Sequence, residues 1–181
     1  NGIESLFIGV PHDATFEGLA PDNSKPLVFY GTSITQGACA SRPGITHIAI
    51  LGRQLNRPTI NLGFSGSGHM DEAVGKLMVE LDASCYVIDC LPNMDKAMVE
   101  KRCVPLVKLI RKGRPNTPIV LVEDRRYTNS WLTPYKSKFH DENHAALKKA
   151  YDLLKTEGVQ QLYYLPGDNL LGHDTEGTTD A

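Results

Sequence analysis

The stretch LVFYGTSITQG, residues Leu27–Gly37, decides the fold of this chain. Four apolar, β-prone residues stop at Gly31, and Ser33 stands four residues before a second glycine, Gly37. A strand buried inside a parallel sheet has this pattern, and ligands bind such sheets at the carboxyl ends of their strands. We therefore expect Leu27–Tyr30 to form a strand that delivers the Ser33 hydroxyl to that edge.

Strand and helix patterns alternate after this stretch. Further strand-like runs are Thr59–Leu62, Cys85–Cys90, Pro118–Val122 and Gln161–Leu165. Between them, apolar residues repeat at helical spacing, as in residues 48–55, 70–81 and 94–112, and again in 141–156. Pro105 predicts that 94–112 divides into two helices, the second beginning near Val104. The alternation predicts an α/β fold, a three-layer α/β/α sandwich with a mostly five-stranded parallel sheet of the flavodoxin-like type.

Residues 1–26 differ from the rest. Ser5–Val10 is strand-prone, but Pro11, Pro21 and Pro26 interrupt the residues after it. We expect 1–26 to be the tail of a preceding, β-rich unit plus a linker packed against the main domain, 27–181. The chain begins without an initiator Met and ends in a loop-like run at Ala181, which favours a piece of a longer protein.

Composition narrows the function classes. The chain has 181 residues, of which 41% are hydrophobic and 22% charged, and a net charge of -2. One globular domain fits this length, and the charge gives no reason to expect nucleic acid or an anionic membrane as partner. No apolar run is long enough to span a membrane, and the oligomeric state stays open. Four cysteines fit neither a metal site nor a disulfide framework, and Cys85 and Cys90 are expected to be buried thiols.

Candidate chemistry follows successive strands. Right-handed crossovers place the carboxyl ends of parallel strands at one edge, so Ser33, the glycine-rich loop 63–68 and Asn93 should meet there. A serine hydroxyl reacts when a base takes its proton and donors stabilise an oxyanion. Taken singly, these residues are also typical of helix caps and flexible turns. Their joint placement favours a catalytic site.

At these residues the chain resembles the SGNH hydrolases, a branch of the GDSL-type esterases and acylhydrolases. GTSITQG at 31–37 is similar to the first family block, with Thr32 where Asp is frequent. NLGFSG at 61–66 is similar to the second block, and LPNM at 91–94 to the third, with Pro92 in place of the usual glycine. The resemblance covers about residues 27–180.

The resemblance implies a mechanism without metal or organic cofactor. Ser33 attacks an ester carbonyl, and the N–H groups of Ser33 and Gly66 with the Asn93 amide hold the oxyanion. The last family block is Asp-x-x-His, in which Asp180 matches the acid. The histidine falls three residues later, beyond this chain, which we interpret as truncation. The chain alone is therefore expected to be nearly inactive.

Four further residues are candidates for binding the substrate: Thr32, Arg42, Arg125 and Trp131. The arginines can bind a sugar hydroxyl or a carboxylate, and Trp131 can stack on a sugar, although solvated or self-anchoring loops explain them equally. We expect a serine esterase that cleaves short, acetyl-like esters of a carbohydrate or another small molecule. Such an activity favours a secreted or periplasmic location.

Two alternatives from another class stay open. A flavodoxin-type domain would wrap the hydroxyls of residues 32–35 around a phosphate or FMN, but it leaves Gly66 and Asn93 without a function. A non-catalytic carbohydrate-binding relative would explain the missing histidine. A P-loop is excluded, because Ala38 stands where that motif needs lysine.

Overall fold

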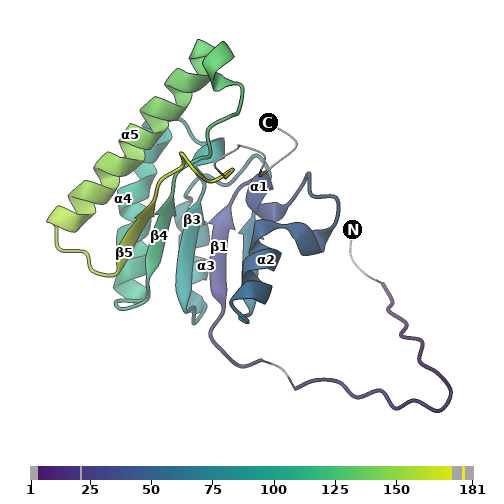
Figure 1. Ribbon diagram of the computed structural model, residues 1–181. Helices are drawn as coiled ribbons and strands as arrows, with labels where there is room; N and C mark the ends of the chain where they lie inside the picture. Colours follow the sequence, from purple (N-terminus) through teal and green to yellow (C-terminus); the bar gives the residue numbers. More distant parts are fainter. Residues whose placement is uncertain (1–3, 21, 173–176, 178–181) are drawn as a thin grey trace.

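The computed structural model describes residues 4–20, 22–172 and 177. Its centre is a parallel five-stranded sheet in the order β2-β1-β3-β4-β5 (Figure 1). The strands are β1 (Leu27–Gly31), β2 (Thr59–Gly63), β3 (Cys85–Asp89), β4 (Ile119–Val122) and β5 (Leu162–Leu165). Each strand lies within one residue of the run predicted for it, so the predicted sheet is confirmed.

The connections between the strands contain helices, as an α/β fold requires. They are α1 (Ser33–Gln36), α2 (His47–Gln54), α3 (Glu72–Glu80), α4 (Lys96–Gly113) and α5 (Pro134–Thr156). Three short 3₁₀ turns are η1 (Pro43–Ile45), η2 (Leu91–Asn93) and η3 (Ser130–Leu132). Within the described part of the chain, no helix is long and apolar enough to cross a membrane.

The two faces of the sheet carry different helices. Side chains alternate along a strand, so Val28, Tyr30 and Ile88 share one face, where they pack with buried residues of α3, α4 and α5. Phe29 faces the other way and meets His47 of α2 edge to face, with ring centroids 6.2 Å apart. The sheet therefore has helices on both sides, which is the predicted sandwich.

The predicted division of 94–112 into two helices is wrong. Helix α4 is one helix of 18 residues with Pro105 inside it. Its buried stripe, which includes Val99, Cys103 and Leu106, continues on both sides of the proline. Pro105 itself faces solvent, so the carbonyl of Lys101, which loses its helical donor, can bond to water instead. Packing of the stripe outweighs the local cost of the proline.

Replacing Pro105 with alanine is expected to raise the free energy of unfolding by about 1–3 kcal/mol, because it restores the missing hydrogen bond inside the helix. Urea unfolding monitored by circular dichroism measures this. Pro134→Ala is the matched control: Pro134 is the first residue of α5, where proline is tolerated, and a near-zero change is expected. A loss of stability in Pro105→Ala would contradict the continuous helix.

Helix α5 begins earlier than predicted. The apolar periodicity predicts a helix over 141–156, which leaves His140 outside it. The helix begins at Pro134, and His140 and His144 are both buried within it. They face the carboxylates of Glu123 and Asp124, which follow β4. Helical periodicity does not predict partners that come from another element.

The segment before the sheet does not form the expected strand. Residues 4–20 have no regular secondary structure, and Ser5–Val10 finds no strand to pair with among the described residues. Leu6, Phe7 and Leu19 are 76%, 89% and 98% exposed. Figure 1 shows this segment running away from the sheet, so the predicted packing against the main domain is wrong for residues 4–20.

The linker end does contact the main domain. Lys25 pairs with Asp82 at 3.1 Å, and the Pro26 carbonyl accepts the Ser84 N–H at 2.8 Å. The assignment of 1–26 to a preceding unit stays a prediction.

Candidate functional site

Ser33 is the first residue of α1, directly beyond the carboxyl end of β1. Thr32 has extended backbone and caps the helix, because its hydroxyl accepts the Ile34 N–H at 3.2 Å. Gly37 ends the helix after a single turn. Ser33 is partly exposed and is not the residue that caps α1. The Ser33 hydroxyl therefore does not cap the helix, which was the simplest structural role predicted for it.

The glycine-rich loop after β2 packs directly on the Ser33 turn. The Phe64 N–H donates to the Gly31 carbonyl at 2.9 Å. At Gly68, a Cβ atom would lie 2.2 Å from that same carbonyl oxygen, so only glycine permits this approach. Gly66 has open space around it but a φ of +68°, a conformation that favours glycine. Residues 63–68 thus bring backbone N–H groups beside Ser33.

Asn93, the last residue of η2, contacts the same loop. With its side-chain amide oriented toward the donors, Oδ1 accepts the N–H groups of Gly66 and Ser67 at 3.1 Å and of Gly68 at 3.3 Å. The structure therefore brings Asn93 and Gly66 together beside the Ser33 turn, at the carboxyl edge of the parallel strands. In this state the Gly66 N–H bonds to Asn93.

Asn143 of α5 holds the segment that carries Asn93. Its Nδ2 donates to the Met94 carbonyl at 2.8 Å, and both residues are buried. This contact ties the end of η2 to the longest helix of the protein. Asn143 was not predicted from the sequence. The only indication of its role was that a polar residue lies on the buried face of a helix.

Asp89 is a second group that was not predicted from the sequence. It ends β3 as the register partner of Gly31, and its Oδ2 accepts the Thr35 hydroxyl at 3.0 Å. Burial raises the pKa of Asp89 to about 7, and burial lowers the pKa of His47, whose Nε2 lies 4.0 Å from the same oxygen. The sequence feature that could have indicated Asp89 is an acidic residue at the end of an apolar strand. The Asp89 carboxyl thus bonds to Thr35 of α1, two residues along the chain from Ser33.

Replacing Asp89 with asparagine is expected to stabilise the protein at pH 8 by about 4 kcal/mol and to change little at pH 4. The unfolded carboxyl ionises near 3.9 and the folded one near 7, so the folded state binds the extra proton between these values. Stability therefore falls as pH rises through this window, and asparagine removes that loss while it still accepts from Thr35.

Unfolding in urea at pH 4 and pH 8 measures the effect. Asp13→Asn, in the exposed N-terminal segment, is the control for removing one negative charge. Equal changes at both pH values would contradict the burial of the Asp89 carboxyl.

Beyond β4, two carboxylates meet two histidines of α5. Glu123 Oε2 lies 3.3 Å from His144 Nδ1, and Asp124 Oδ2 lies 3.6 Å from His140 Nδ1. Burial raises the pKa of Asp124 and lowers that of His140 to about 4, so His140 is neutral at pH 7. Asp124 has its strong partner in Arg125, at 2.5 Å.

Glu123 also holds the chain that leaves β5. It accepts the Tyr164 hydroxyl and, at 2.7 Å, the N–H of Gly167. Arg126 supports the same segment through Asp168, with Nε and Oδ1 2.8 Å apart. The segment that leads toward Asp180 is thus tied to the carboxyl end of β4.

The structure separates the residues predicted to bind substrate. Thr32 is fully buried and serves as the cap of α1. Arg42 is exposed before η1. Arg125 is largely buried, paired with Asp124, and lies over the Tyr127 ring at 4.6 Å. Its guanidinium is therefore engaged within the protein. Asp180 lies outside the described residues.

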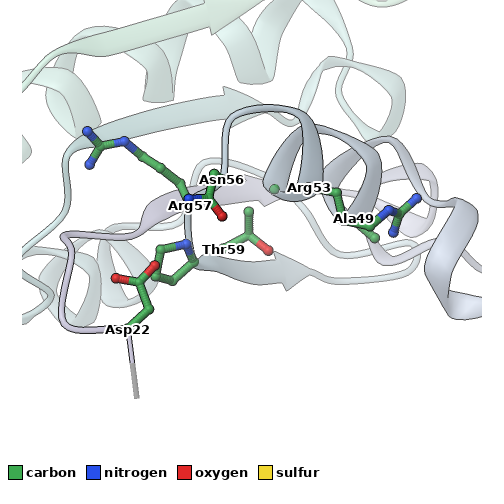
Figure 2. Close-up of a pocket in the computed structure, with 8 residues that line it drawn as sticks. Asp22, Ala49, Arg53, Asn56, Arg57 and Thr59 are labelled. Atoms are coloured by element: carbon green, nitrogen blue, oxygen red, sulfur yellow. The ribbon is translucent and has the colours of Figure 1, made fainter. Parts of the chain in front are cut away.

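Trp131 lies on η3 and is 78% exposed. It lines a pocket of about 410 Å³ together with residues from the start of α5. A second pocket, of about 540 Å³, lies at the opposite edge of the sheet, where Asn56, Arg57 and Thr59 precede or begin β2 (Figure 2). Because that pocket lies at the amino end of the strand, it is remote from the Ser33 turn.

Solved structures of other proteins share this fold. A putative GDSL-like lipase from Bacteroides ovatus is 33% identical with a TM-score of 0.82, over 87% of this chain and 47% of that one. The salicylyl-acyltransferase SsfX3 from a tetracycline biosynthetic pathway is 27% identical with a TM-score of 0.70, over 81% and 44% of the two chains. The chain thus spans about half the length of these two proteins.

A family two carbohydrate esterase from Clostridium thermocellum, in complex with cellohexaose, shares the fold at 15% identity. Its TM-score is 0.62, over 82% of this chain and 55% of that one. No curated protein matched. The model of the GDSL-like lipase/acylhydrolase family matches residues 24–181. Because this match covers most of the chain, the chain belongs to the GDSL-like lipase/acylhydrolase family.

Proposed function

We propose that this chain is the catalytic part of a serine esterase that cleaves short-chain, acetyl-like esters, including esters of carbohydrates. The observation that carries the proposal is the meeting of three segments. The Ser33 turn and the 63–68 loop share a backbone hydrogen bond, and Asn93 contacts the N–H of Gly66. Family membership favours hydrolase chemistry at this place over phosphate or FMN binding.

Ser33 is the proposed nucleophile. Its Oγ attacks the ester carbonyl, and the proton passes to an imidazole that the family pattern places three residues after Asp180, beyond this chain. The alcohol leaves with that proton, and the acyl group stays on Ser33. Water then attacks the acyl-enzyme, which releases the acid and restores the hydroxyl.

The N–H groups of Ser33 and Gly66 and the Asn93 amide are the proposed oxyanion donors. The contact between Asn93 and the loop supports this role, because it holds the Asn93 amide beside the loop's backbone N–H groups before a substrate binds. For Gly66 to donate to the oxyanion, its N–H must exchange Asn93 for the substrate oxygen.

Acyl transfer is the second candidate. The observation that favours it is the 27% identity with a salicylyl-acyltransferase over 81% of this chain. Both reactions pass through the same acyl-Ser33, and they differ in whether water or an acceptor alcohol takes the acyl group.

Hydrolysis of p-nitrophenyl acetate tests the proposal, measured on this chain and on a polypeptide that extends through the Asp-x-x-His block. The extended form is expected to be active and this chain to be slower by about 10⁴-fold or more, because its Ser33 lacks the imidazole. A higher rate with p-nitrophenyl octanoate than with the acetate would contradict the preference for short acyl groups. No hydrolysis by the extended form would favour a non-catalytic binding domain.

Acyl transfer is measured in the same assay by adding an acceptor alcohol such as methanol. Formation of methyl acetate in place of acetate, at an unchanged rate of p-nitrophenol release, would identify the transferase. Acetate as the sole product is the result expected for an esterase.

A further inference from the structure

The loop between β4 and α5 is anchored without its tryptophan. The Tyr127 ring contacts two cations, with the Arg125 guanidinium 4.6 Å and the Lys136 ammonium 4.9 Å from its centroid. The Thr133 hydroxyl donates to the Asn129 carbonyl at 3.1 Å, and Lys136 Nζ donates to Asn129 Oδ1 at 3.3 Å. These contacts hold both ends of the loop in place.

Trp131 therefore contributes little to holding its own loop. It is 78% exposed, and Leu132 beside it is 63% exposed. A buried tryptophan contributes strongly to stability through its area, but one exposed to this degree does not. Anchoring of its own loop therefore does not explain Trp131, and the face of its indole ring is available to a ligand.

The pocket beside Trp131 has compensated charges and several hydroxyls. Ser130 and Ser137 bring hydroxyl groups to its lining. Its carboxylates already have cations: Glu142 pairs with Lys138 at 3.7 Å, and Asp141 pairs with Arg126 at 2.8 Å. A charged ligand gains little from such a lining, whereas a neutral ligand with many hydroxyl groups finds both donors and acceptors.

The shape and chemistry of the pocket point to a neutral sugar. The pocket is an open surface depression of about 410 Å³, which would cover one face of a ligand and leave the other in solvent. Trp131 and Pro134 supply the apolar lining, which is too little for a lipid chain but enough for one face of a sugar ring. We propose that Trp131 and this pocket form a saccharide subsite, which we call the Trp131 subsite.

The subsite lies where it could bind part of the substrate of the proposed esterase. This biological role rests on the proposed function. The Trp131 loop follows β4 and Ser33 follows β1, and β3 lies between them, so both are at the same edge of the sheet (Figure 1). Two strand spacings separate the two strands by about 10 Å. The subsite is therefore proposed to hold another part of an oligosaccharide whose ester lies at Ser33.

Intrinsic fluorescence tests the proposal directly, because Trp131 is the chain's one tryptophan. The chain and its Ser33→Ala variant are titrated with cellohexaose, xylohexaose and mannohexaose. A saturable shift of the emission with at least one of them, equal in both proteins, is the expected result. No saturable change with any of the three, up to millimolar concentration, overturns the proposal.

Calorimetry with the binding sugar then locates the site. Trp131→Ala is expected to weaken binding at least tenfold, and Trp131→Phe to restore part of it, because phenylalanine keeps an aromatic face. Leu132→Ala is the matched control, since Leu132 is exposed on the same turn but does not line the pocket. Equal affinity in Trp131→Ala and the unaltered chain overturns the subsite.

The result is independent of the catalytic proposal. Sugar binding without ester hydrolysis by the extended polypeptide would refute the esterase and leave the Trp131 subsite standing. Hydrolysis without any sugar binding would refute the subsite alone.

Discussion

Replacing Ser33 with alanine is expected to lower kcat/KM for p-nitrophenyl acetate by about 10⁴-fold or more in the polypeptide that extends through the Asp-x-x-His block. Alanine removes the oxygen that forms the acyl-enzyme, and loss of the nucleophile removes almost all of the rate that a serine triad supplies. The residual activity is that of the oxyanion donors and of binding alone. Initial rates over a range of substrate concentrations measure this.

The same variant is expected to fold as the unaltered protein does. Thr32 caps α1, and Ser33 has no hydrogen bond among the side-chain contacts of the described residues, so its midpoint of thermal unfolding should change by no more than about 2 °C. Ser24→Ala, at an exposed position before β1, is the matched control and should keep full activity. An active Ser33→Ala variant would contradict the assignment of the nucleophile.

Replacing Asn93 with alanine is expected to lower kcat by about 10²–10³-fold, the usual effect of losing one oxyanion donor. Asn93 also accepts three backbone N–H groups from the 63–68 loop, so alanine is expected to destabilise that loop as well. The alanine variant alone therefore does not separate catalysis from structure.

Asn93→Asp separates the two roles. Aspartate keeps an oxygen that accepts from Gly66, Ser67 and Gly68 but has no amide hydrogen to donate, and its charge repels an oxyanion. We expect kcat to fall at least as far as in Asn93→Ala while KM and thermal stability stay near those of the unaltered protein. Normal turnover by Asn93→Asp would remove the Asn93 amide from the oxyanion site.

The sheet was predictable because its signals are local. Each of the five strands is an apolar run that ends in a turn, and Gly31 and Gly63 mark the ends of two of them. The meeting of Ser33, the glycine loop and Asn93 followed from the handedness of crossovers. No knowledge of side-chain contacts was needed for either.

The remaining features depend on contacts distant in sequence. Pro105 predicted a break in the helix, but packing of the buried residues on both sides of it keeps α4 continuous. His140 and His144 are buried in α5, where Glu123 and Asp124, the two residues after β4, face them. Asp89 owes its raised pKa to burial beside Thr35 of α1. Periodicity describes one element at a time and therefore does not show such partners.

The central claim is that Ser33 is an activated nucleophile, and covalent labelling tests it most directly. The extended polypeptide is treated with a fluorophosphonate, digested, and analysed by mass spectrometry. We predict one phosphonyl group per chain, carried by the peptide that contains Ser33, and no labelling after Ser33→Ala. Labelling of another residue, or no labelling of an intact and folded protein, would contradict the claim.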